Sequence, residues 1–216
     1  MQRLAIFDLD GTITRHGTLP SYIAGLLGQR PWQLARVLRA APVVVAYLLG
    51  RADRGALKAR LLRATLGDRG RAELQEWTVV FVRRLLDGGL RSDALRAIER
   101  HRQHGDKLVL LSASPDLYVP AIGSALGFDE VISTGLGWTG EHLNGALTTA
   151  NRRGSEKTRC LAELERRHPR LRTAAYGNDA ADLDHLRRVD EPLLVCGSRR
   201  ARREAVRAGI PSASWR

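Results

Sequence analysis

Residues 4–12 read Leu-Ala-Ile-Phe-Asp-Leu-Asp-Gly-Thr, and this stretch decides the fold. The apolar run at 4–7 predicts a short buried strand, and the acids and glycine that follow predict a turn. Because side chains alternate along an extended chain, Asp8 and Asp10 are expected on the same side. Gly11 lets the chain turn sharply away. Two carboxylates placed in this way can divide their work, one as nucleophile and the other as proton donor and acceptor.

Outward from this stretch, four more apolar runs have the form of buried strands. They lie at 107–112, 131–134, 173–176 and 192–196. Helical patterns separate most of them, and these lie at 92–104, 118–127, 155–167, 180–188 and 199–208. Apolar strands that alternate with helices are typical of a parallel sheet covered on both faces. The sequence therefore predicts an α/β fold with a Rossmann-like sheet.

The interval 14–86 breaks this alternation. It contains only helical patterns, at 21–27, 31–49, 55–65 and 71–86. We interpret it as a helical cap inserted after the first strand, so that the core consists of 1–13 and 87–216. A smaller irregularity at 135–147 contains the pair Asn144-Gly145, a turn signal, and predicts a β-hairpin.

Polar residues also follow two other strands and open one helix. Ser112-Ala113-Ser114 ends the second strand and can hold a phosphoryl oxygen through hydroxyl and backbone N–H groups. Lys157 opens a helix and can place a cation beside developing charge. The run at 177–182 supplies Asn178, Asp179 and Asp182, which are oxygen ligands suited to Mg²⁺. Since ligands bind beyond the carboxyl ends of parallel strands, we expect one common site.

These motifs, in this order, resemble those of the haloacid dehalogenase superfamily. The DxDGT motif corresponds to residues 8–12, followed by Ser112, Lys157 and an acidic run after Gly177. The helical insertion lies where that superfamily has its C1 caps. Together with the hairpin and the ending at 203–209, it looks like the IB branch, which contains phosphoserine phosphatase and phosphatidylglycerophosphatase C.

The resemblance implies a Mg²⁺-dependent phosphatase. Asp8 would form an aspartyl-phosphate, and Asp10 would protonate the leaving oxygen and then activate water. Ser112 and Lys157 would orient and neutralise the phosphoryl group. The rest of the implied phosphate site consists of Gly11, Thr12 and Ala113. The Asp8 carboxylate and the backbone carbonyl of Asp10 would bind the metal.

One position departs from the pattern of the superfamily. Asn178 stands where an acid usually ligates the metal. An amide oxygen can still coordinate Mg²⁺, with one negative charge fewer. Asp179 could replace it, and Asp182 could act through water, so the third protein ligand stays open between these three residues.

The predicted cap restricts the substrate. Residues 11–52 contain no Asp or Glu, whereas phosphoserine phosphatase needs an acid there for the substrate ammonium group. Arg15 and His16 stand where the chain leaves the site, which favours an anionic phosphomonoester. Apolar residues and arginines alternate through 30–51, a composition similar to the cap of phosphatidylglycerophosphatase C. These residues are either an interfacial membrane segment or the cap's own core.

Composition limits the classes of protein. The 216 residues are 44% hydrophobic with a net charge of +12, which is typical of a globular chain. Two cysteines exclude a disulfide framework and fit a reducing cytoplasm. Aspartates within the first ten residues argue against a signal peptide, and the apolar run at 40–49 is too short to span a bilayer.

The positive charge is concentrated in two segments. Residues 15–80 have eleven Arg or Lys against four acids, and residues 199–216 have six against one. Such segments attract phosphates, acidic lipids or nucleic acid, although 32 of the 35 basic residues are Arg, so a compositional preference explains the surplus equally well. We expect a phosphorylated small molecule or lipid as substrate, with peripheral contact to anionic membrane as a further possibility. The rival hypothesis is a catalytically weak binding protein that holds nucleic acid or acidic membrane.

Overall fold

A six-stranded parallel sheet forms the centre of the computed structural model, which describes residues 2–28, 38, 42, 45 and 54–216. The strand order is β3-β2-β1-β6-β7-β8. In chain order the strands are β1 (Arg3–Phe7), β2 (Lys107–Pro115), β3 (Glu130–Thr134), β6 (Arg172–Gly177), β7 (Glu191–Val195) and β8 (Ser212–Ala213). Every pairing is parallel, and Ala5 in the central β1 lies opposite Leu108 and Ala174. The predicted α/β fold is therefore confirmed.

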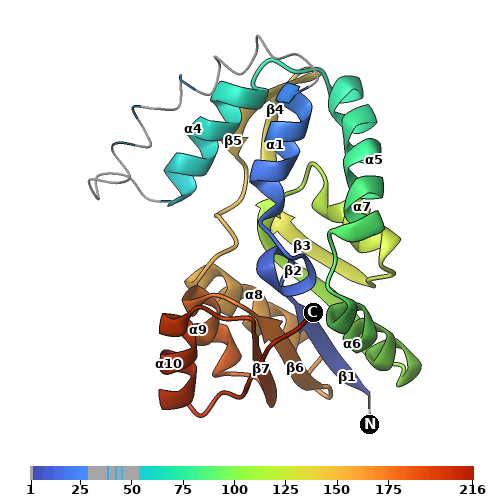
Figure 1. Cartoon of the computed structure of the whole chain (residues 1–216), viewed down its shortest axis with the longest axis vertical. Helices are drawn as coiled ribbons and strands as arrows, with labels where there is room; N and C mark the ends of the chain where they lie inside the picture. Colours follow the sequence, from blue (N-terminus) through green and yellow to red (C-terminus); the bar gives the residue numbers. More distant parts are fainter. Residues whose placement is uncertain (1, 29–37, 39–41, 43–44, 46–53) are drawn as a thin grey trace.

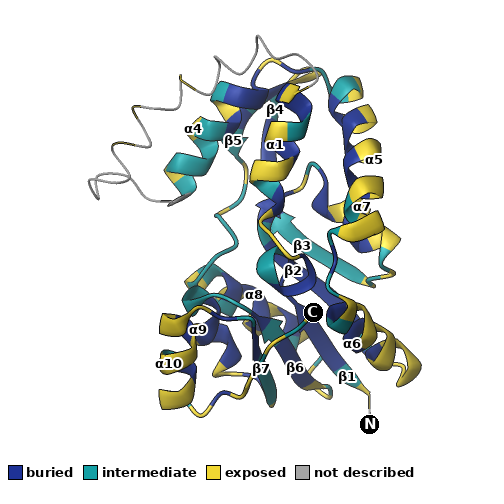
Figure 2. Cartoon of the chain, viewed as in Figure 1, coloured by how far each residue is buried: buried dark blue, intermediate teal, exposed yellow. Residues whose placement is uncertain are grey.

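Helices cover both faces of this sheet because β1 is apolar on both sides. Ala5 and Phe7 belong to one buried cluster, with α6 (Ser92–Gln103) and α7 (Val119–Ala125). Leu4 and Ile6 face the opposite cluster, with α8 (Ser155–Arg167), α9 (Leu183–Leu186) and α10 (Arg199–Arg207). Figure 2 shows β1 in the colour of buried residues, and the outer faces of α6 and α10 exposed.

A second group of elements lies above the carboxyl edge of the sheet (Figure 1). We call it the upper layer. It comprises α1 (Thr18–Gly28), α4 (Arg54–Leu66), α5 (Arg71–Gly88) and the antiparallel pair β4 (Leu136–Thr139) and β5 (His142–Leu147). Stacked and edge-to-face contacts of Tyr22 with Trp77, Phe81 and Tyr118 join α1 and α5 to the start of α7. This aromatic packing holds the upper layer on the core.

The predicted hairpin is confirmed, but its turn is not at Asn144-Gly145. The chain reverses between Thr139 and His142, where Gly140 has a φ of +57°. Gly145 lies inside β5, and a Cβ there would be 2.7 Å from the Cα of Arg63 in α4. Close approach of strand and helix therefore explains this glycine. The hairpin belongs spatially to the upper layer, since the backbones of Leu143 and Arg69 are also joined by a hydrogen bond of 3.0 Å.

Most other predicted elements are confirmed with ends shifted by a few residues. The predicted helix at 180–188 is divided into a 3-10 turn, η3 (Ala180–Asp182), and the short α9. The two-residue β8 was not predicted. The predicted helix at 31–49, which includes the apolar run at 40–49, falls largely outside the described residues. Within the part of the chain that the structure describes, no helix has the length and apolar character needed to cross a bilayer.

Candidate active site

The first strand delivers Asp8 directly into a cavity of about 350 Å³ at the carboxyl edge of the sheet. After Phe7 the chain enters a tight turn, η1 (Leu9–Ile13), in which Gly11 has a φ of +80°. A Cβ at Gly11 would lie 2.1 Å from Nδ2 of Asn178. Glycine is therefore required both for the turn and for the approach of the Asn178 amide. This approach brings the DxDGT motif together with the acidic run that follows Gly177.

The other cavity residues come from all the strand ends that the sequence singled out. The lining consists of Asp8, Asp10, Gly11, Arg15, His16, Gly17, Ala113, Arg153, Lys157, Asn178, Asp179 and Asp182. Most of the predicted site residues thus meet in one place. Two do not line the cavity: Thr12 and Ser112 are fully buried beside it.

Lys157 joins two carboxylates at the bottom of the site. Its Nζ donates to Oδ1 of Asp8 at 2.6 Å and to Oδ1 of Asp182 at 2.7 Å. All three side chains are at least nine-tenths buried. The second oxygen of Asp8 accepts a hydrogen bond from the Thr12 hydroxyl at 3.1 Å. Both oxygens of Asp8 are therefore held, and the orientation of this carboxylate is fixed.

The electrostatics of these three groups differ. Burial raises the pKa of Asp8 to about 7, although the Lys157 ammonium opposes the shift. Burial alone would also raise the pKa of Asp182, but the Lys157 charge and its hydrogen bond lower it to about 2. Burial opposes the charge of Lys157, yet the two carboxylates raise its pKa. Lys157 and Asp182 therefore form a permanent buried ion pair at neutral pH, and Asp8 shares the same cation.

Asp10 is held by hydroxyl and backbone groups rather than by a cation. Its carboxylate accepts hydrogen bonds from the backbone N–H of Thr18, the first residue of α1, and from the Ser114 hydroxyl. The Thr18 hydroxyl lies 3.2 Å from that of Ser114 and donates to the hydroxyl of Tyr118 at 3.0 Å. Asp10 is thus oriented by residues at the joint between the sheet and the upper layer.

The three candidates for the third metal ligand, Asn178, Asp179 and Asp182, differ in their contacts. Asp179 accepts from Arg153 at 2.7 Å and from the backbone N–H of Ala181, so it caps η3. Asp182 accepts from the backbone N–H groups of Asn178 and Asp179 through its second oxygen, each at 3.0 Å. Only the Asn178 amide lies directly against the η1 turn.

Lys58 is a site residue that sequence reasoning missed. It projects from α4 in the upper layer, and its Nζ donates to the backbone carbonyl of Ala113 at 2.6 Å and to Oδ1 of Asn151. The chain has only three lysines, at 58, 107 and 157, and that scarcity was the available signal. Arg153, Thr18 and Ser114 also gain contacts here that no motif spacing predicted.

The fold and the strand-edge site define the class as a Rossmann-like α/β enzyme. A sequence model of the haloacid dehalogenase-like hydrolases matches residues 5–187. The chain therefore belongs to the haloacid dehalogenase-like hydrolase family, and the resemblance predicted from its motifs is confirmed.

Individual proteins are similar to this chain in sequence or in fold. Protein CicA of Caulobacter vibrioides (strain NA1000 / CB15N) is 34% identical over 189 residues, which cover 87% of this chain and 83% of the relative. A protein of unknown function from Bordetella pertussis Tohama I has the same fold, with a TM-score of 0.83, 21% identity and 98% coverage of each chain. A structure described as a phospho-aspartyl intermediate analogue of phosphoserine phosphatase has a TM-score of 0.67 and 16% identity, and covers 97% of this chain and 99% of that one.

Proposed function

We propose that this protein is a Mg²⁺-dependent phosphomonoester hydrolase that works through an aspartyl-phosphate on Asp8. One observation carries the proposal: Asp8 and Asp10 line a single cavity in which the Lys157 ammonium lies 2.6 Å from the Asp8 carboxylate. Membership of a hydrolase family and the likeness in fold to phosphoserine phosphatase support it.

In the first step, an oxygen of Asp8 attacks the phosphorus of the substrate. The bond from phosphorus to the leaving oxygen breaks, and Asp10 gives its proton to that oxygen. In the second step, Asp10 takes a proton from water as the water oxygen attacks the same phosphorus. The bond between phosphorus and Asp8 then breaks, which releases phosphate and restores both carboxyl groups.

The neighbouring groups prepare these steps. Lys157 stabilises the ionised form of Asp8 and lies close enough to neutralise charge on the phosphoryl oxygens. We assign Gly11 and Ala113 to the phosphate site through their position in the cavity lining. Thr12 orients Asp8 from below. We also assign Ser112 to the phosphate site: it lies beside the cavity, and its oxygen accepts the backbone N–H of Ser114 at 3.0 Å.

The donors around the η1 turn fit Mg²⁺, although with little charge. Among the described residues, no group of three or more Asp, Glu, His or Cys side chains is placed to hold a metal ion. We propose a site that combines the Asp8 carboxylate with neutral oxygens, namely the backbone carbonyl of Asp10 and the amide oxygen of Asn178. All are hard ligands. We favour Asn178 over Asp179 and Asp182 because those two carboxylates already accept hydrogen bonds from Arg153 and from backbone N–H groups. When bound, the ion would supply positive charge for the phosphoryl oxygens.

For the substrate, we propose a small anionic or lipid-type phosphomonoester. Arg15 and His16 are exposed at the edge of the cavity and present basic groups there. We propose that residues 14–86 act as the cap of the enzyme, together with the β4–β5 hairpin that is hydrogen-bonded to them. We also propose that the cap attaches the protein peripherally to anionic membrane. The vesicle co-sedimentation described below tests this attachment.

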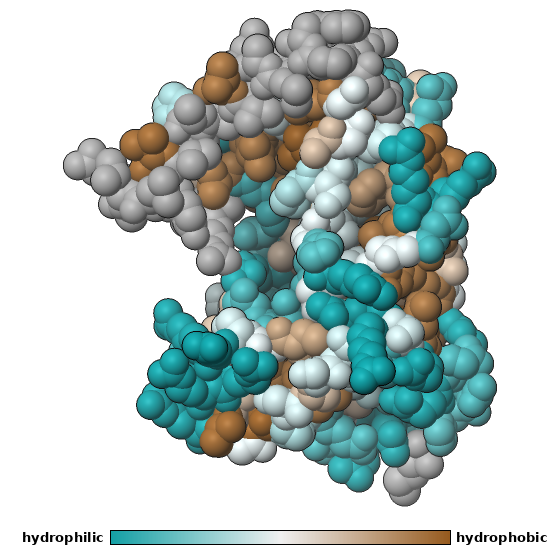
Figure 3. Space-filling model, viewed as in Figure 1, coloured by the Kyte–Doolittle hydropathy of each residue, from teal (hydrophilic) through white to brown (hydrophobic). Residues whose placement is uncertain are grey.

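A second candidate function is favoured by Asn178 and by α10. Asn178 weakens the metal site, and α10 carries five arginines on a helix whose Val206 is 76% exposed. Figure 3 shows the region of α10 as strongly hydrophilic. A catalytically weak protein could use this surface to hold nucleic acid or acidic membrane.

A phosphatase screen decides between the two. It uses aryl, sugar, polyol and lipid phosphates, each with Mg²⁺ and with chelator, and vesicle co-sedimentation in parallel. Phosphate release that requires Mg²⁺ supports the hydrolase. No release from any substrate, together with salt-sensitive binding to nucleic acid or anionic vesicles, supports the binding protein.

A further inference from the structure

A second cavity, of about 360 Å³, opens from the first between the core and the upper layer. The two cavities share Asp10, Ala113 and Arg153 in their linings. The rest of the second cavity is formed by Leu19, Leu57, Lys58, Leu61, Ser114 and Asn151. It therefore begins at the proton donor of the proposed reaction, which is where the leaving group of a substrate must lie.

Lys58 is one of the two cations that line this cavity. Among the described residues its ammonium donates to Ala113 and Asn151, so one of its three N–H groups is available for a ligand. The carboxylate of Asp10 is close enough to interact with its charge. In the proposed reaction Asp10 is protonated until it gives its proton to the leaving oxygen. During that time Asp10 has no negative charge and does not neutralise Lys58.

Arg153 adds a second cation to the same wall. One of its guanidinium nitrogens donates to Asp179, and the residue contributes to the linings of both cavities. Its positive charge also lowers the pKa of Lys58, as a like charge on the same wall does. Two cations held near each other favour an anion between or beside them.

The remaining wall is apolar. Leu19 of α1 and Leu57 and Leu61 of α4 are partly buried, and all three line the cavity next to Lys58. One wall therefore offers positive charge and the other offers hydrocarbon.

We propose that this second cavity binds the leaving group of the substrate, and that Lys58 with Arg153 recognises a second phosphate-type anion on it, attached to an apolar portion that packs on the three leucines. The inference rests on the proposed phosphatase function and narrows its substrate class. A phosphomonoester joined to a phosphodiester or to a second phosphate has this chemistry.

The test compares two ligands that differ only in the second anion, propane-1,3-diol bisphosphate and propane-1,3-diol monophosphate. Binding is measured with Mg²⁺ in an Asp8→Asn background, so that the ligands are not consumed, and turnover is measured in the parent enzyme. We expect the bisphosphate to bind at least about tenfold more tightly, because a hydrogen bond to a charged group is typically worth a factor of ten or more.

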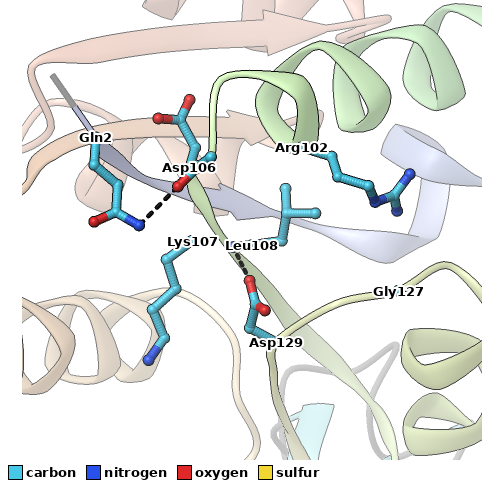
Figure 4. A pocket seen from close by; sticks show the side chains of 8 residues that line it. Gln2, Arg102, Asp106, Lys107, Leu108, Gly127 and Asp129 are labelled. Carbon is cyan, nitrogen blue, oxygen red and sulfur yellow. Dashed lines mark hydrogen bonds between the residues drawn. The ribbon is translucent and has the colours of Figure 1, made fainter.

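Substitutions then assign the preference to Lys58. Lys58→Met is expected to reduce the ratio of the two dissociation constants by about tenfold, and Lys58→Arg to preserve most of it. The matched control is Lys107→Met. Lys107 lines a different pocket, with Gln2, Arg102 and Asp129, at the amino end of β2 (Figure 4). Its replacement should leave the ratio unchanged.

A parallel comparison distinguishes the sources of the anion. Short-chain phosphatidylglycerophosphate and its deacylated headgroup carry the same phosphodiester, and tighter binding of the lipid identifies a lipid substrate, whereas equal binding identifies a soluble phosphoester. The inference is overturned if the parent shows no preference for the bisphosphate, or if Lys58→Met weakens both ligands equally. Preference without turnover would contradict the proposed function alone, and turnover without preference would contradict this inference alone.

Discussion

The floor of the candidate active-site cavity and the roof of the second cavity beside it are built in opposite ways. The floor, which we define as Asp8, Lys157 and Asp182, is almost fully buried, and every charge in it has a partner within 2.7 Å. The roof, which we define as Lys58 with Leu19, Leu57 and Leu61, is only partly buried and combines one cation with hydrocarbon. A closed set of ion pairs suits a reaction that needs fixed charges, and an open, mixed surface suits the selection of a leaving group.

The floor and roof should therefore respond differently to substitution. Changes in the floor should affect all substrates or the stability of the fold, whereas changes in the roof should affect the choice between substrates.

The largest effect is expected at the nucleophile. Asp8→Asn keeps the shape of the side chain but removes the attacking carboxylate, so hydrolysis of an aryl phosphate should fall by more than about 10³-fold. Circular dichroism should show an intact fold, since Thr12 can still donate to the amide oxygen. Turnover near that of the parent would contradict the assignment of Asp8.

The next largest effect is expected on stability. Asp182→Asn removes the ionised partner that lowers the charge cost of burying Lys157, and the loss in unfolding free energy should be about 3 kcal/mol. Denaturant unfolding at neutral pH measures it. Asp184→Asn serves as the control, because Asp184 is exposed on α9 and its contact with Arg187 is long, at 3.8 Å. Equal losses in unfolding free energy in the two variants would show that the buried ion pair stabilises the fold no more than the exposed one does.

A smaller effect is expected in metal affinity. Asn178→Asp adds a carboxylate to a site of hard oxygen ligands, so the Mg²⁺ concentration for half-maximal activity should fall by about fivefold to tenfold. Asn144→Asp in the hairpin controls for the added charge. If the Mg²⁺ requirement does not change or increases, Asp179 or Asp182 supplies the ligand instead.

The smallest effect is a pH dependence of the roof. Burial lowers the pKa of Lys58 to about 8, with Arg153 acting in the same direction and Asp10 opposing it. Lys58 is therefore mostly charged near pH 7 and mostly neutral near pH 9, so the preference for a second anion should fall several-fold across this interval. A phosphodiester ligand keeps its own charge constant. Lys58→Arg should flatten the profile, and an unchanged slope in that variant would assign the titration to another group.

The residues of the floor could be predicted from the sequence because they come after predicted strands or near the start of a predicted helix. Asp8, Lys157 and Asp182 each stand directly after a predicted strand or at a helix start, and the parallel sheet brings such positions to one edge. The contacts that separate Asp179 from Asn178 could not be predicted, since they depend on the cap of η3 and on the orientation of Arg153.

The roof could not be predicted, because its position depends on how the upper layer packs. Lys58 lies on α4 with no motif around it, and its partner Ala113 is 55 residues away. The same holds for Thr18, whose backbone N–H reaches Asp10 only through the turn between β1 and α1. The turn of the hairpin was misplaced because Gly145 serves packing against Arg63 rather than chain reversal.

The central claim is that Asp8 carries the phosphoryl group during turnover. The most direct measurement is an acid quench of the parent enzyme during hydrolysis of an aryl phosphate with Mg²⁺, followed by peptide mass spectrometry. We expect one added phosphoryl group on the peptide that contains Asp8, sensitive to alkali and absent from Asp8→Asn. A phosphoryl group on another residue, or active turnover with no phosphorylated enzyme at any quench time, would contradict it.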